Sequence, residues 1–169
     1  MLTLQSFPPI ADNTARVLIL GSMPGAASLA AQRYYAHPHN AFWPIVCTLL
    51  KVAPADRYET HIAALRATHI ALWDVLQSCT RQGSLDAGIA RESEVANDFA
   101  GFFEAHPAID RIFFNGAKAE ASFRRLVLPT LASGPLKLIR LPSTSPAHAA
   151  MSFADKLSAW QVILQASKP

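Results

Sequence analysis

Four short apolar runs recur along the chain, separated by longer segments that have helical periodicity. The runs are rich in β-branched, leucine and aromatic residues, and each is followed within two residues by Gly, Asp, Asn or Pro. This pattern is typical of strands that are buried on both faces of a sheet. The predicted strands cover residues 15–20, 68–72, 109–114 and 136–141.

The remaining segments divide into helices and loops. Apolar residues three and four positions apart predict helices at residues 41–52, 54–65, 91–105, 117–128 and 152–166. Asn40 is placed as the residue that caps the first of these helices, and Val95 and Phe153 belong to the faces expected to be buried. Residues 1–14 are predicted as an irregular lead-in, and residues 77–88, with several glycines, as a loop.

The alternation of strands and helices predicts one α/β domain over residues 1–169. Strands separated by helices favour a three-layer α/β/α arrangement around a four-stranded, mostly parallel sheet. With 169 residues, of which 51% are hydrophobic, the chain can bury one sizeable core. Nothing in the sequence suggests a boundary between two domains.

The charge and the cysteine content of the chain narrow the possible functions and locations of the protein only slightly. The formal net charge of +3 is compatible with a polyanionic partner without demonstrating one. Cys47 and Cys79 stand 32 positions apart in no ligand spacing, so we expect reduced, buried thiols. No apolar run approaches the roughly 18 residues of a membrane span, and the first residues lack the basic start and apolar run that are typical of a secretory leader, so we do not expect one. We therefore expect a cytoplasmic protein without a membrane partner.

Polar residues gather where three of the predicted strands end. Gly21-Ser-Met-Pro-Gly follows the first strand, Asn115-Gly116 follows the third, and Pro-Ser-Thr-Ser-Pro follows the fourth. The carboxyl ends of parallel strands meet at one edge of a sheet, where ligands bind in open α/β folds. We therefore expect one cleft that contains amides, hydroxyls and aromatic rings but few charges.

These segments carry a resemblance to a known family. GSMPG, YYAHPHNAFW, FFNG and LPSTSPAH, in this order along the chain, resemble the uracil-DNA glycosylase superfamily, and most closely its hypoxanthine (deoxyinosine) DNA glycosylases. The resemblance implies a monofunctional glycosylase of base excision repair, which flips a deaminated purine out of DNA and hydrolyses its N-glycosidic bond. It implies that the partner is double-stranded DNA with a damaged base, and it leaves open whether single-stranded DNA is also bound. It implies no cofactor. We expect a monomer.

The resemblance also suggests roles for the polar residues near the strand ends. It makes Asn40 and Asn115 the predicted catalytic residues: Asn40 would orient water or contact the sugar or base, and Asn115 would read the base edge. Tyr35 would stack on the flipped base. Each residue also has a structural alternative. Asn40 could only cap a helix, Asn115 could only form a turn, and Tyr34 and Tyr35 could both be packing residues.

Two positions depart from the pattern of the uracil enzymes. Gly21, Ser22 and Met23 are assigned to the base-binding pocket, yet the uracil enzymes carry Asp or Asn at the position of Met23, where it holds or activates water. Leu141 stands where the efficient uracil enzymes have a histidine that supports the leaving base. The expected catalysis is therefore largely electrostatic and slow, and efficient removal of uracil is not expected.

The segment after the last strand is assigned to DNA contacts. Ser143, Thr144 and Ser145 would hydrogen-bond phosphates, and Pro146 and His148 lie where the family inserts a wedge into the vacated base stack. A serine- and proline-rich turn that caps the next helix is the structural alternative.

Other readings of the sequence remain open. A mismatch-specific uracil or thymine glycosylase is the alternative enzyme, and a module that binds damaged DNA without turnover is the alternative outside enzymes. His37 and His39, on either side of a proline, are poor evidence for a metal site, and we predict no metal. Asp74 could be catalytic, but a strand-end aspartate that caps the following turn is the favoured interpretation.

Overall fold

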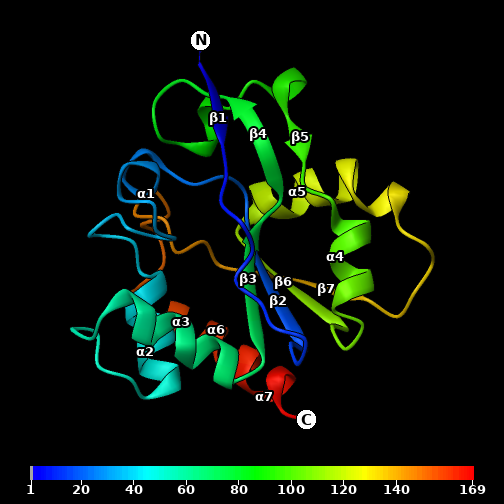
Figure 1. The fold of residues 1–169 in the computed structure, drawn as a ribbon. Coiled ribbons are helices and arrows are strands. Elements are labelled where there is room, and N and C mark those ends of the chain that lie inside the picture. Colours follow the sequence, from blue (N-terminus) through cyan, green and yellow to red (C-terminus); the bar gives the residue numbers. More distant parts are fainter. Residues whose placement is uncertain (1) are drawn as a thin grey trace.

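The computed structural model describes residues 2–169 and has a four-stranded parallel sheet at its centre (Figure 1). Its strands are β2 (Val17–Gly21), β3 (Ile70–Asp74), β6 (Arg111–Asn115) and β7 (Lys137–Leu141), in the order β3-β2-β6-β7. The register places Leu18 of β2 between Ala71 and Ile112. All four predicted strands are confirmed, and each begins one or two residues later than the sequence pattern indicated.

Helices cover both faces of this sheet, so the predicted three-layer α/β/α architecture is confirmed. One face packs against α4 (Phe99–Ala105) and α5 (Ala117–Leu126), through a cluster that includes Phe99, Phe114 and Phe123. The other face packs against helices that lie together on the opposite side of the strands in Figure 1, namely α2 (Phe42–Leu50), α3 (Tyr58–Ala67), α6 (Phe153–Trp160) and α7 (Val162–Ser167). The alternation of side chains along each strand supplies both cores.

A second, antiparallel sheet lies beside the first, and the sequence pattern did not predict it. It consists of β1 (Thr3–Gln5), β4 (Leu76–Thr80) and β5 (Val95–Ala96), with β4 in the middle. The predictions of an irregular segment at residues 1–14 and of a loop at residues 77–88 are therefore wrong in part. These strands are two to five residues long and mix polar with apolar residues, so they lack the continuous apolar run of a buried strand.

The predicted helix at residues 91–105 is also wrong in its first half. Only α4 is α-helical, and short 3₁₀ turns, η1 (Asp86–Gly88) and η2 (Arg91–Ser93), lie in the preceding segment. Val95, predicted to be buried, is 49% exposed in the short strand β5. Phe153, also predicted to be buried, is 47% exposed in the first turn of α6. Cys47 and Cys79 are buried free thiols, as predicted.

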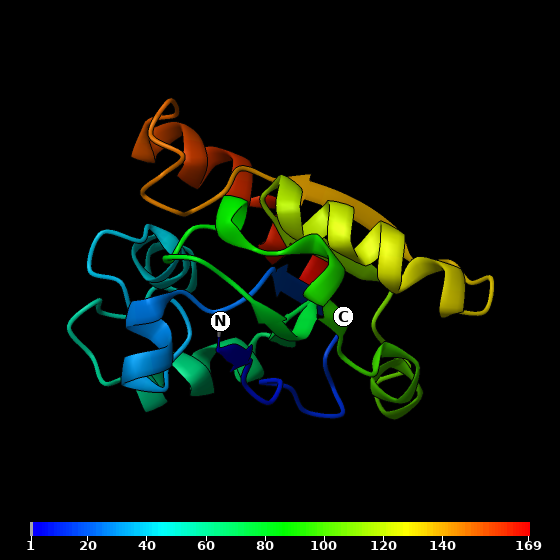
Figure 2. The ribbon, with the colours of Figure 1, turned by 90° about the horizontal axis from the view of Figure 1, so that it is seen from above.

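The topology directs the loops toward one edge of the parallel sheet. The chain passes from β2 to β3 on one side and later from β6 to β7 on the other, so a crevice forms outside the carboxyl ends of β2 and β6. The predicted loop after β2 contains the short helix α1 (Ala26–Ala31). Seen from above, the loop that follows α1 and the loop that follows β7 lie on the same side of the molecule (Figure 2).

Candidate active site

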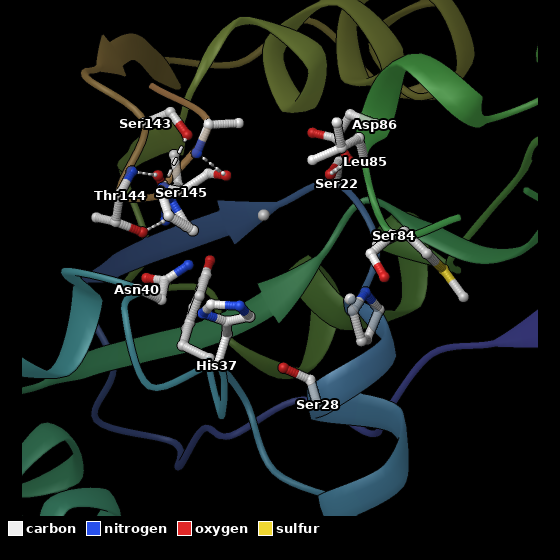
Figure 3. A pocket seen from close by; sticks show the side chains of 18 of the residues that line it. Ser22, Ser28, His37, Asn40, Ser84, Leu85, Asp86, Ser143, Thr144 and Ser145 are labelled. Carbon is white, nitrogen blue, oxygen red and sulfur yellow. Dashed lines mark hydrogen bonds between the residues drawn. The ribbon is translucent and has the colours of Figure 1, made fainter. Parts of the chain in front are cut away.

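A cavity of about 450 Å³ opens at the carboxyl edge of the parallel sheet. It is lined by the β2–α1 turn, the first residues of α1, the loop before α2, the loop that contains η1, the segment after β7, and the last residues of β3 and β6. Every residue that the sequence assigned to the site lines this cavity, and these residues are Gly21, Ser22, Met23, Tyr35, Asn40, Asn115, Ser143, Thr144, Ser145, Pro146 and His148. Segments that are far apart in the sequence therefore form one pocket (Figure 3).

Asn40 lies in the wall of the pocket at the start of α2. Its Oδ1 accepts a hydrogen bond of 2.9 Å from the backbone N–H of Phe42, in the first turn of the helix. Ala41, the next residue, donates its N–H to the carbonyl of Thr144 and so ties this wall to the segment after β7. The predicted cap is therefore wrong by one residue: Ala41 is the N-cap of α2, and the side-chain oxygen of Asn40 supports the helix start from the position before it. The amide nitrogen of Asn40 remains free to donate to a ligand.

Asn115 joins the end of β6 to the segment after β7. Its Nδ2 donates to Thr144 Oγ1 at 2.9 Å, and its Oδ1 accepts from the N–H of Thr144, also at 2.9 Å. Thr144 is only 1% exposed, so its hydroxyl is committed to this pair rather than presented to solvent. One N–H of Asn115 remains for a ligand in the pocket. The pair fixes the orientation of the amide, because both of its ends are held.

The two neighbouring tyrosines have different surroundings. Tyr34 is a buried packing residue whose hydroxyl donates to the carbonyl of Pro8 at 2.7 Å. Tyr35 has a left-handed backbone conformation, with a φ of 53°, and its ring stacks on Phe42 with 4.0 Å between the ring centroids. Its buried hydroxyl has no hydrogen-bond partner. Burial, together with the nearby charge of Asp74, holds the pKa of the Tyr35 phenol well above its usual range.

The pocket is also lined by two carboxyl groups, which the sequence did not assign to the site. Ser22 donates a hydrogen bond of 2.6 Å to Asp86, and burial raises the pKa of Asp86. Asp74, at the end of β3, is 4% exposed, and its Oδ2 has no hydrogen-bond partner. The predicted role of Asp74 as a turn cap is therefore wrong. Burial and the negative charge of Asp86 raise the pKa of Asp74 to about 7.

The carboxyl group of Asp74 requires glycine at position 21. A Cβ at Gly21 would collide with Asp74 Oδ1 and would come within 2.8 Å of the Tyr35 hydroxyl. Both side chains thus close over the backbone at the end of β2. The only sequence signal for this arrangement was the polar residue directly after an apolar run, a signal that Asp74 shares with ordinary turn residues.

The two departures from the uracil enzymes occupy different places. Met23 lines the pocket and is 6% exposed, within the core cluster on the α4 and α5 side of the sheet. Leu141 is 5% exposed and belongs to the core cluster on the opposite side. A thioether and an alkyl chain neither activate water nor donate a hydrogen bond.

The segment after β7 forms the exposed rim of the pocket. The N–H of Ser145 donates to Ser143 Oγ at 3.2 Å, and the carbonyl of His148 accepts from Lys156 Nζ at 2.7 Å. Gly116 has a φ of +94°, and a Cβ there would approach that of Ser143 to 3.0 Å, so only glycine fits beneath this turn. Pro146 and His148 are exposed to solvent.

Further lining residues lie opposite this rim in loops that sequence patterns do not resolve. Ser28 is buried and accepts a hydrogen bond of 3.1 Å from the N–H of Ala36, which holds the loop before α2. Ser84, Leu85 and His37 lie around the pocket mouth in Figure 3, and Leu85 is 56% exposed. An exposed leucine at a pocket mouth could not be distinguished from a core residue by sequence.

The pocket lining combines a mostly apolar surface with several polar groups and carries no permanent positive charge. Among residues 2–169, no lysine or arginine lines it, and no group of three or more His, Cys, Asp or Glu residues in this part of the chain could hold a metal ion. No helix within the described residues is long and apolar enough to cross a membrane. The chemistry available is therefore that of amides, hydroxyls, aromatic rings, two histidines and two carboxyl groups.

Comparison with known proteins places the chain in a family. Residues 8–164 match the model of the uracil DNA glycosylase superfamily. A protein of Methanosarcina acetivorans named "Hypoxanthine DNA glycosylase" is 34% identical over 162 residues, which cover 95% of this chain and 98% of that protein. A protein of Methanosarcina barkeri with the same name is 34% identical over 116 residues, which cover 68% of this chain and 72% of that protein.

The fold leads to the same conclusion. The solution NMR structure of a candidate uracil DNA glycosylase from Methanosarcina acetivorans superposes with a TM-score of 0.81 and 32% sequence identity. The superposition covers 98% of this chain and 99% of that structure. The match extends over the strand ends that form the pocket, and the chain therefore belongs to the uracil DNA glycosylase superfamily.

Proposed function

We propose that this protein is a DNA glycosylase that removes hypoxanthine from DNA by hydrolysing the N-glycosidic bond of deoxyinosine, in base excision repair. The observation that carries the proposal is the single pocket at the carboxyl edge, lined by all the segments in which the sequence resembles the hypoxanthine enzymes. Two relatives with 34% identity bear the name of that activity. Met23 and Leu141, in place of the polar residues of the uracil enzymes, favour hypoxanthine over uracil as the substrate.

The pocket offers the parts that such a reaction requires. A base that has been flipped out of the duplex would enter beside Tyr35, whose ring is already held against Phe42. Asn115 would donate its remaining N–H to the base edge, in an orientation fixed by Thr144. Asn40 would donate from its free amide nitrogen to the attacking water or to the sugar. Donors held in place before the reaction stabilise developing charge at little reorganisation cost.

The reaction proposed is simple hydrolysis, without a covalent intermediate on the protein. An accompanying lyase step would require an amine nucleophile, and no lysine in the described part of the chain lines the pocket. The product would be an intact strand with an abasic site.

Double-stranded DNA is the proposed partner, bound by a monomer. Ser143 and Ser145, which line the pocket, would hydrogen-bond phosphates, and Pro146 and His148 are exposed to solvent beside them. Thr144 would act indirectly, because its polar groups hold Asn115.

Single-turnover cleavage tests the proposal directly. Matched duplexes that contain deoxyinosine, deoxyuridine or deoxyxanthosine are incubated with excess protein, and alkali then converts abasic sites into strand breaks. We expect deoxyinosine to be cleaved fastest, with strand breaks only after alkali. Cleavage of deoxyuridine alone would instead indicate a mismatch-type uracil enzyme. Binding of deoxyinosine duplex without cleavage would reject the enzyme in favour of a damage-binding module.

A further inference from the structure

Asp74 is a buried acid in the pocket that the proposed roles of Asn40, Asn115 and Tyr35 leave unused. It is 4% exposed, lines the cavity, and its Oδ2 has no hydrogen-bond partner within the protein. Buried polar atoms without partners are rare in folded proteins, and each requires a reason. Because Asp74 lines the cavity, its carboxyl group lies where a ligand that enters the pocket can contact it.

The surroundings of Asp74 favour a neutral carboxyl group. The titratable groups that face it are Asp86 from the loop that contains η1, and the phenols of Tyr34 and Tyr35 from the loop before α2. Asn97, after β5, donates only to the Asp74 backbone carbonyl, and Gly21 of β2 offers no side chain. Among the described residues 2–169, no cation balances a charge on Asp74, so the carboxyl group keeps its proton more readily than an exposed aspartic acid.

Of the two neighbouring carboxyl groups, Asp86 is the one that holds the negative charge. It accepts a hydrogen bond from Ser22, and the charges of Arg81 and Lys118 act in its favour. Asp74 receives no such support at Oδ2. Two neighbouring carboxyl groups in different surroundings are an arrangement in which one stays ionised and the other carries a proton near neutral pH.

We propose that Asp74 is the general acid of the reaction and donates its proton to N7 of the departing hypoxanthine. This inference rests on the proposed function and assigns to it a catalytic residue. As the proton reaches N7, the bond between C1′ and N9 breaks, and its electron pair stays on the purine, which leaves as the neutral base. Water adds to C1′ of the resulting oxocarbenium ion and loses a proton, and the Asp74 carboxylate takes up a proton again. Atoms and charge balance, with water as the one reactant consumed.

The pH dependence of cleavage separates a proton donor from a structural residue. The active form of Asp74 is the protonated one, and the pKa of this group is raised to about 7. We therefore expect the single-turnover rate on deoxyinosine to fall as the pH rises through about 7. The variant Asp74→Asn should be slower by about 10²-fold at low pH, the usual scale of acid catalysis, and its rate should not follow this decline. A decline that persists in Asp74→Asn would assign it to another group and overturn the proposal.

A modified substrate tests the atom that receives the proton. 7-Deaza-2′-deoxyinosine has carbon in place of N7 and cannot be protonated there. We expect the wild-type protein to cleave it far more slowly than deoxyinosine and Asp74→Asn to be no slower than wild type on this substrate. An equal effect of Asp74→Asn on both substrates would exclude N7 as the acceptor.

Two further variants complete the test. Asp110→Asn is the matched control, because Asp110 precedes β6 at the opposite edge of the sheet and its side chain is 51% exposed. It should cleave like wild type. Asp86→Asn removes the neighbouring negative charge, so it should move the decline in rate to lower pH while the fold is retained. An unchanged pH profile in Asp86→Asn would contradict the proposed pair of carboxyl groups.

Failure of this inference and failure of the proposed function give different results. If the wild-type protein does not cleave deoxyinosine, the function is wrong, and the role of Asp74 falls with it. If the wild type cleaves deoxyinosine and Asp74→Asn cleaves it at the same rate with the same pH profile, the function stands and only the role of Asp74 is rejected.

Discussion

Asn40 uses one end of its side-chain amide inside the protein and leaves the other end to the pocket. Asn40→Ala removes both, and we expect it to lower single-turnover cleavage of deoxyinosine by about 10²-fold or more, the usual cost of one preorganised donor. It should also lower the free energy of unfolding by about 1 kcal/mol, because the first turn of α2 loses its acceptor. Cleavage rates and urea unfolding measure the two effects separately.

The variant Asn40→Asp is the matched control. It keeps an oxygen for the N–H of Phe42 and removes the amide donor. We expect stability close to that of wild type together with an activity as low as that of Asn40→Ala. If Asn40→Asp were fully active, the role of Asn40 would be limited to supporting the start of α2.

Tyr35 combines a ring that is useful for stacking with a hydroxyl that has no partner. Tyr35→Phe keeps the ring on Phe42 and removes the unsatisfied oxygen, so we expect unchanged or slightly higher stability and retained binding of deoxyinosine duplex. Tyr35→Ala should weaken binding by about 1–3 kcal/mol, the scale of one base stacked on an aromatic ring. Titration of duplex binding compares the two variants, and equal affinities would remove the stacking role.

Among the secondary-structure elements, α5 is held to the second sheet by a single buried acid. Glu94, directly before β5, accepts hydrogen bonds from Lys118, Ser122 and Arg125 of α5, and its side chain is fully buried. Lys118 and Arg125 remain partly exposed. Glu94 is the one acidic group that both cations contact, so the packing of α5 against β5 depends on it.

Glu94→Gln should therefore destabilise the protein. Removing the charge leaves two cations without their partner, and breaking such a pair costs about 3 kcal/mol at the lower end of the usual range. Urea unfolding measures the loss. Glu92→Gln, at an exposed position of η2, is the control and should be nearly neutral. If Glu94→Gln lowers the free energy of unfolding by less than about 1 kcal/mol, as for a surface ion pair, solvent already screens the contacts of Glu94.

The elements that could be predicted from sequence are those with a strong local pattern. β2 is buried at all five residues and follows from its apolar run, as do the ends that place Gly21 and Asn115 in one pocket. β1 and β5 could not be predicted in this way. Their pairing with β4 depends on partners far along the chain, and their residues are partly exposed. Val95 and Phe153 are apolar at helical spacing but lie where no other element covers them.

The site shows the same division. The resemblance of their segments to a known family brought Asn40, Tyr35 and Asn115 into the prediction. Asp74 was taken for a turn cap, because sequence shows that a carboxyl group follows a strand but not how deeply it is buried or what faces it. The commitment of Thr144 to Asn115 likewise depends on the distance between β6 and the segment after β7.

At the scale of the whole molecule, Asp74 links the pocket to global stability. Its pKa is about 7 in the folded protein against a usual value of 3.8, so the folded state binds the proton more tightly than the unfolded state. This contribution to stability is fully present below the unfolded value and is lost as the pH rises through the folded value. We expect the free energy of unfolding to fall by a few kcal/mol between about pH 4 and pH 7.

Urea unfolding over this pH range tests the linkage. In Asp74→Asn the decline should be much smaller, and what remains should reflect Asp86, whose pKa is also raised by burial. The same pH dependence of stability in the wild type and in Asp74→Asn would show that Asp74 does not carry the linkage.

The pairing of β1 with β4 has a consequence for how motion could be measured in this protein. Thr3–Gln5 are far in sequence from the pocket, yet they pair with the strand that leads directly into the loop of Ser84, Leu85 and Asp86. Opening of that loop that spreads along β4 would release the amide protons of β1 to exchange with solvent. Hydrogen-exchange rates of Thr3–Gln5 would thus report how often the loop of Ser84, Leu85 and Asp86 opens. If this loop closes on bound DNA, exchange at Thr3–Gln5 should become slower.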